Sequence, residues 1–158
     1  MAELSTAQKA TLRAAILATP ALSALTNDYQ ALAAALNANA NPVVKAWLTS
    51  VSPEMMDDAP DYTTFDAISA GKRDSWAFLI ARPRDFTRNK TRQWIADVWG
   101  TVSANSNSEK ILLAGTENIS VAEQIFGGSS KSTGTVTGID RVWTGDIGVN
   151  EINNILYP

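Results

Sequence analysis

The sequence predicts a mainly α protein: a compact helical bundle of about five to seven helices, with a short β hairpin or extended arm near the C-terminus. Apolar residues recur at three- and four-residue spacing through most of residues 1–126, and alanine, a strong helix former, is frequent there. From Gly127 onward, glycine, serine, threonine and β-branched residues replace that period. We therefore expect a helical body over residues 1–126, and a flexible loop, short strands and a terminal helix over residues 127–158.

The first helices are marked by their caps. Ser5 and Gln8 fit a capping box, and the helix they open should end near Ala18, ahead of a proline. Pro20–Leu25 has the length of one further turn. Asn27 or Asp28 then caps a third helix that runs through Leu36.

The next segment is expected to contain a loop, a short helix and a connector. Asn37–Pro42 is the loop, and its proline suits the first position of a helix whose apolar face lies in Val43–Val51. Met55–Pro60 is acidic and bounded by prolines, which favours an exposed connector.

Two amphipathic helices follow, joined by a basic elbow. Thr63 or Thr64 caps the first, which runs to Ile80 ahead of Pro83 and is weakened by about 1 kcal/mol at its internal glycine, position 71. Thr87 caps the second, which closes at Gly100.

The C-terminal part combines further capped helices with irregular segments. Ser106 and Ser120 start two more capping boxes, which belong either to one helix or to two. Gly127–Thr135 is expected to be a loop, and Val136–Ile147 one or two strands with a hairpin around Gly138 or Gly145. Val149–Leu156 predicts the terminal helix.

Composition excludes several kinds of chemistry. The chain has neither cysteine nor histidine, so it lacks disulfides, thiolates, the commonest general base and the commonest zinc ligand. The net charge of −3 repels nucleic acid weakly. No apolar run approaches a membrane span, and the N-terminus does not resemble a signal peptide. We expect a protein that is made in a cytoplasm, has no enzymatic activity, binds no cofactor and does not associate with a membrane.

Two local patterns resemble ligand sites but fail their templates. Gly128–Ser132 lacks the glycines of a phosphate-binding loop and follows a helix rather than a strand. The carboxylates at positions 54, 57, 58 and 61 lack EF-hand spacing, so a solvated connector is favoured over a metal site. We assign no catalytic, cofactor-binding or metal residue.

The candidate site is therefore a protein interface. The basic elbow suits an anion or an acidic protein surface, although a solvated face balanced by Asp85 and Asp97 is the alternative. A tryptophan beside an arginine in the C-terminal part is a candidate interface anchor, because both residue types are enriched at binding hot spots. The candidate interface residues are Arg82, Arg84, Arg88, Lys90, Arg92, Arg141 and Trp143.

Several stretches resemble a family of small virion proteins of tailed bacteriophages, the head–tail connector (adaptor or head-completion) type. They are Thr6–Ile16, Asn41–Trp47, Gly71–Trp76 and Val121–Gly127, followed by a Gly/Ser/Thr loop and Gly145–Ile147. Asn118–Ser120 departs from the basic, alanine-rich helix of that family, which puts the continuity of this helix in doubt.

The resemblance implies a structural subunit at the head–tail junction of a virion. Such subunits form a homo-oligomeric ring, commonly of twelve copies, beneath the portal protein, and they dock a tail-side neck protein. DNA passes through the ring without sequence-specific binding. The alternatives are another neck, tail or capsid-associated protein, or a small DNA-binding regulator that uses Thr87–Trp99 as its recognition helix.

Overall fold

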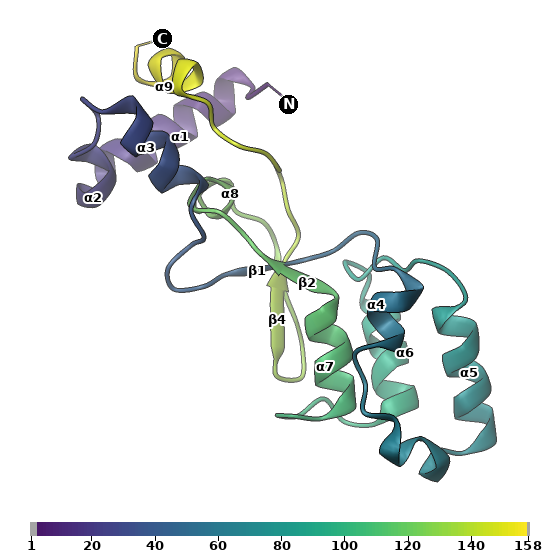
Figure 1. Cartoon of the computed structure of the whole chain (residues 1–158). Coiled ribbons are helices and arrows are strands. Elements are labelled where there is room, and N and C mark those ends of the chain that lie inside the picture. Colours follow the sequence, from purple (N-terminus) through teal and green to yellow (C-terminus); the bar gives the residue numbers. More distant parts are fainter. Residues whose placement is uncertain (1–2, 158) are drawn as a thin grey trace. The chain divides into compact units, whose positions relative to one another are not determined.

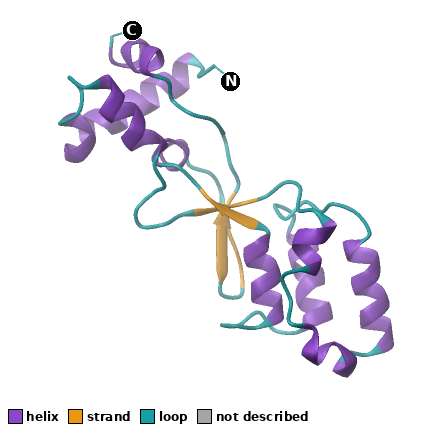
Figure 2. Ribbon diagram, in the orientation of Figure 1, coloured by secondary structure: helices purple, strands orange, loops and turns teal. Residues whose placement is uncertain are grey.

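The structure, a computed structural model, describes residues 3–157 (Figure 1). Helix accounts for about 52% of the chain and strand for about 12%. Four strands form one mixed sheet in the order β2-β1-β4-β3 (Figure 2). The fold is thus mixed α/β, and the expected mainly helical bundle is wrong. Part of a segment expected as a helix forms a strand because a distant part of the chain supplies its backbone partner, and part of a segment expected as a loop forms a strand of a local hairpin.

The chain divides into two compact units that do not follow its order. Unit 1 comprises Met1–Val44, Asn118–Ser129 and Arg141–Pro158, and unit 2 comprises Lys45–Glu117 and Ser130–Asp140. The boundary that we expected at residue 127 does not coincide with this division, because residues 127–158 contribute to both units.

Unit 1 is built from helices whose starts are set by side-chain caps. In it lie α1 (Thr6–Ala18), α2 (Pro20–Ser23), α3 (Tyr29–Asn37), α8 (Val121–Phe126) and α9 (Val149–Leu156). Ser5 and Ser120 each form the reciprocal bonds of a capping box, and Asp28 accepts a bond from the backbone of α3. These caps confirm the predicted starts of α1, α3 and α8.

The core of unit 1 draws on each of these helices, and α9 packs against α1 and α3 (Figure 1). Each fully buried leucine or isoleucine contributes about 1.5–3 kcal/mol. The buried apolar residues at its centre are Leu12, Ile16, Leu32, Leu36, Ala122, Ile152 and Ile155. Ile152, Ile155 and Leu156 form the buried face of α9, whereas Val149 at its start is exposed.

One side chain holds the segment before α9 in place. The Asn37 amide donates to the carbonyl of Ile147 at 3.0 Å and accepts from its N–H at 2.8 Å. This pair imitates a strand pairing and satisfies both backbone groups of a residue that is only 1% exposed.

Three of the strands, and most of the fourth, lie in unit 2. β1 (Lys45–Trp47) runs parallel to β4 (Val136–Ile139), with Ala46 opposite Ile139. β3 (Ser130–Thr133) pairs with β4 in an antiparallel hairpin, and β2 (Thr116–Asn118) lies at the other edge of the sheet.

The strands correct two predictions. The helix expected over Val43–Val51 contains β1, and the loop expected over Gly127–Thr135 contains β3. The hairpin turns at Gly134 rather than at Gly138 or Gly145. Gly134 has a φ of +58°, and a Cβ there would lie 2.4 Å from Val102 Cβ, so the turn requires glycine.

The helices of unit 2 are α4 (Pro53–Asp57), the 3₁₀ helix η1 (Tyr62–Ala67), α5 (Ala70–Ile80), α6 (Asn89–Trp99) and α7 (Asn107–Ala114). α5 and α7 both pack against α4 and α6 (Figure 1). The expected acidic connector is wrong at α4, which Ser52 caps and Met56 anchors in the core. The single helix expected from Thr63 to Ile80 is interrupted, because Ile68 takes an extended conformation between η1 and α5.

The helix ends predicted near the elbow are confirmed at Ile80 and Gly100, but the predicted caps are wrong. Asp61, not Thr63 or Thr64, caps η1, and Arg88 rather than Thr87 precedes α6. Gly100 closes α6 at φ +94°, as its position indicated. Within residues 3–157, no helix combines the length and apolar character needed to cross a bilayer.

Aromatic side chains dominate the core of unit 2. Trp47, Trp76 and Phe86 are each at most 2% exposed. Trp47 donates its indole N–H to the carbonyl of Lys131, and Trp76 donates to the Tyr62 hydroxyl at 2.9 Å. The indoles therefore enter the core with their polar atoms satisfied.

Candidate functional site

An exposed aromatic side chain marks the surface formed by α5 and α6. Phe78 is 59% exposed, because Trp76 and Leu79 occupy the inward face of α5. Its ring lies 5.7 Å from that of Trp94 on α6. Phe78 was absent from our candidate residues, although the signal was present: it falls about 100° away from Leu79 around the helix and therefore off the apolar stripe.

Arg84 joins these two rings to the backbone. Its guanidinium carbon lies 5.5 Å from the centre of the Phe78 ring and 5.3 Å from that of Trp94. The same guanidinium donates to the carbonyls of Leu79 and Phe78, each at 2.6 Å, and so satisfies carbonyls at the end of α5. Burial, and then the nearby charge of Arg82, lower the pKa of Arg84.

The backbone of the elbow is also fixed. Val51 and Arg84 exchange two backbone hydrogen bonds, of 2.8 Å and 3.0 Å. Arg82 also lies over Phe78, with its guanidinium carbon 6.0 Å from the ring centre. We call the group Phe78, Arg82, Arg84, Lys90 and Trp94 the α5–α6 surface.

The remaining elbow cations differ in their surroundings. Arg88 bonds Asp85 at 3.0 Å, so its charge is balanced locally. Burial opposes ionisation of Asp85, but hydrogen bonds from Thr87 and Arg88 outweigh it and lower the pKa of that carboxyl. Lys90 is exposed on the first turn of α6.

Arg92 lies inside the core rather than on the surface. It is 1% exposed, its guanidinium donates to the Phe86 carbonyl at 2.5 Å and to the Thr133 hydroxyl at 2.9 Å, and it stacks 4.7 Å above the Trp47 ring. Burial lowers the pKa of Arg92, while Asp140 and Asp85 act in the opposite direction. Arg92 therefore joins α6 to β3 and offers nothing to a partner.

The two C-terminal candidates belong to unit 1, whereas the elbow belongs to unit 2. Trp143 is 8% exposed and packs edge-on against Phe126, with ring centres 5.1 Å apart. Arg141 pairs with Glu123 at 3.4 Å. Both residues help to build unit 1, so they are not part of the α5–α6 surface.

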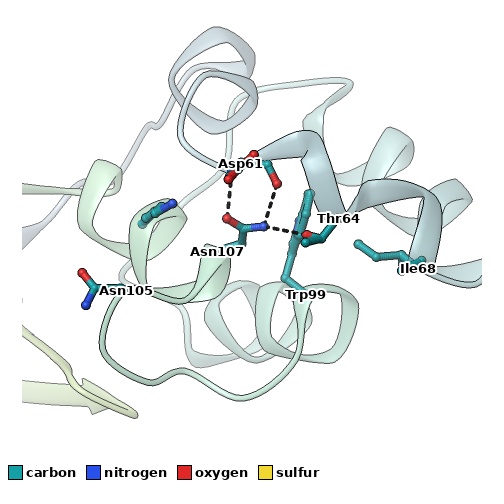
Figure 3. Close-up of a pocket in the computed structure, with 8 residues that line it drawn as sticks. Asp61, Thr64, Ile68, Trp99, Asn105 and Asn107 are labelled. Atoms are coloured by element: carbon teal, nitrogen blue, oxygen red, sulfur yellow. Dashed lines mark hydrogen bonds between the residues drawn. The ribbon is translucent and has the colours of Figure 1, made fainter.

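A hollow of about 450 Å³ opens in unit 2 beside Trp99 (Figure 3). Asn107 lies between Asp61 and Thr64: its amide accepts from the Asp61 N–H at 2.8 Å and donates to the Asp61 carbonyl at 2.9 Å. A longer bond of 3.4 Å reaches the Thr64 hydroxyl. The hydrogen bonds of the Asn107 amide thus join the η1 segment to α7.

The acidic residues do not converge. Within residues 3–157, no three carboxylates lie close enough to hold a metal ion. Glu54, Asp57 and Asp58 are instead exposed on α4.

Comparison of the chain with protein-family models, with curated proteins and with solved structures found no match. Its function must therefore be argued from the site and from the sequence pattern.

Proposed function

We propose that the protein is a structural head–tail connector (adaptor) subunit of a tailed phage, which docks onto other proteins through the α5–α6 surface. The observation that carries the docking role is the solvent-facing Phe78 ring, which lies close to the Trp94 ring and to the guanidinium groups of Arg82 and Arg84.

This composition is typical of a binding hot spot. Tryptophan and arginine are enriched where truncation costs the most binding energy, and aromatic rings contribute large contact areas. Arg84 is already held by two carbonyls and two rings, so binding would immobilise little further side-chain freedom. A surface ordered before docking retains more of its gross interaction energy as affinity.

The charge of the surface favours an acidic protein partner. Arg82 and Lys90 are exposed, and neither forms an ion pair within residues 3–157. Carboxylates of a partner would form charge-assisted bonds with them, and the complementary charge would select that partner over others.

The position in the phage neck follows from the sequence resemblance described above. The resemblance implies that the partners are the portal protein and a tail-side neck protein, and that the subunits form a homo-oligomeric ring around the DNA channel. An acidic chain suits such a channel, because many basic side chains along it would bind the DNA phosphates and slow the passage of the DNA.

The DNA-binding alternative fits the same helix less well. Exposed positions of α6 include Lys90 but also Asp97, and Arg92 is withdrawn into the core. With few cations facing outward, the helix would neutralise few phosphates, so even nonspecific affinity would be low.

The proposal is tested on purified particles of the phage that encodes this chain. We expect quantitative mass spectrometry to find the protein in ring-like copy number, and cryo-electron microscopy to place it at the neck. Phe78→Asp should produce particles that lack the protein or the tail. Leu17→Asp, at an equally exposed apolar residue of α1, is the control and should assemble normally. Intact particles without the protein would overturn the neck assignment, and its presence elsewhere in the virion would support the alternative structural roles.

A further inference from the structure

Unit 2 carries two exposed surfaces of opposite charge. One is the α5–α6 surface, and the other is the solvent face of α4. Glu54, Met55, Asp57 and Asp58 occupy adjacent positions on that face and are all exposed, while Met56 points inward and is fully buried. The chain thus carries a basic aromatic surface and an acidic surface with one protruding methionine.

The two surfaces complement each other in kind. The carboxylates of α4 are opposite in charge to Arg82, Arg84 and Lys90, and the exposed Met55 is an apolar counterpart to the exposed ring of Phe78. Sulfur–aromatic contacts and charge-assisted carboxylate–guanidinium bonds are both favourable. Within residues 3–157, neither Glu54 nor Asp58 forms an ion pair, so both carboxylates remain available.

We infer that the acidic partner of the α5–α6 surface is a second copy of this chain, which presents its α4. The inference rests on the proposed docking function and names its occupant. A contact between two different surfaces of identical molecules is heterologous, and it repeats from copy to copy until the assembly closes into a ring. Each single contact is small and exposed, so it is weak and sensitive to salt, and closure of the ring adds avidity.

Reciprocal charge reversal tests the pairing directly. The first variant, Arg82→Glu with Lys90→Glu, reverses the basic surface and spares the structural Arg84. The second, Glu54→Lys with Asp58→Lys, reverses the acidic surface and spares Asp57, which accepts a bond from the Tyr62 hydroxyl. A third chain carries all four changes. Arg13→Glu with Lys72→Glu is the control, because it changes the net charge as the first variant does at two exposed cations outside both surfaces.

The readout is sedimentation velocity of the full chain from about 5 to 500 µM, at low and high salt, with circular dichroism to verify folding. We expect the unmodified protein and the control to self-associate at low salt. Each reversed variant alone should associate at least about tenfold more weakly, whereas a mixture of the two, or the chain with all four changes, should recover association.

Three results would overturn the inference: an unmodified chain that stays monomeric at every concentration, reversed variants that associate normally, or folded variants whose mixture fails to recover. None of these results would contradict a neck location established on particles. Conversely, absence from the particles would remove the neck role and leave the pairing between copies intact.

Discussion

Replacing Arg92 by methionine should destabilise the protein strongly, although the sequence places this residue in a run of surface cations. The guanidinium is 1% exposed and donates to the Phe86 carbonyl and the Thr133 hydroxyl. Methionine preserves most of the apolar stem but removes the donors. The Phe86 carbonyl is then left buried without its partner, which costs about 1–3 kcal/mol.

The stacking of Arg92 on Trp47 adds to this loss. At 4.7 Å and away from water, a cation–π contact contributes about 2 kcal/mol. Removing a buried charge relieves part of its desolvation cost, which acts in the opposite direction. We therefore expect the free energy of unfolding to fall by about 2–4 kcal/mol on balance.

Equilibrium unfolding in urea, followed by tryptophan fluorescence, measures this difference. Lys90→Met is the matched control, two residues earlier on α6 and exposed, and should change the free energy of unfolding by less than about 0.5 kcal/mol. A loss for Arg92→Met no larger than that of the control would refute the reasoning. It would mean that the guanidinium faces solvent and belongs to the docking surface after all.

Other predictions concern two glycines, the ionisation of Tyr62, and the hydrogen bonds between Asn37 and Ile147. Gly115→Ala should lower the free energy of unfolding by about 1–3 kcal/mol or more, because the new Cβ would lie 1.9 Å from Phe86 Cδ1. Gly71→Ala meets no atom within 4 Å and should raise the free energy of unfolding by up to about 1 kcal/mol. The same urea titration measures both changes. Burial, and then a hydrogen bond to a carboxylate, raise the pKa of Tyr62 to about 12, so its contribution to stability is complete below pH 10 and disappears as the pH rises through 12. Absorbance at 295 nm should show a tyrosine that ionises near pH 12, and Tyr62→Phe should remove that step. Ionisation of all tyrosines near pH 10 would contradict this. Asn37→Ala should speed hydrogen exchange of the Ile147 amide, because it removes the oxygen that accepts from that N–H. Unchanged exchange there would show that Asn37 does not hold this segment in place.

Local signals in the sequence were sufficient for the starts of α1, α3, α7 and α8, but not for those of η1 and α6. Ser5, Asp28, Ser106 and Ser120 all cap the helices they were expected to cap, because a cap depends on a hydroxyl or carboxylate and on the next three residues. The ends of α1 and α6 could also be predicted from neighbouring residues, because a proline follows α1 and a glycine follows α6.

The sheet and the site depended on distant residues. β1 is only three residues long and becomes a strand by pairing with β4 from the far part of the chain, which no helical or alternating pattern in Lys45–Trp47 reveals. Similarly, Arg84 and Arg92 look alike in sequence. One becomes part of a surface and the other part of the core, because Trp47 and Thr133 surround only Arg92.

The interleaving of the two units has a consequence for how the chain is made. Unit 2 needs its last strands, so its sheet cannot be completed until Asp140 has been synthesised, and unit 1 waits for α9. A fragment that ends at Phe126 would have neither β3 nor β4 to close the sheet, nor the terminal helix. Cutting the gene at that position therefore yields two incomplete pieces, and a ribosome-bound chain cannot complete unit 1 until α9 has been synthesised.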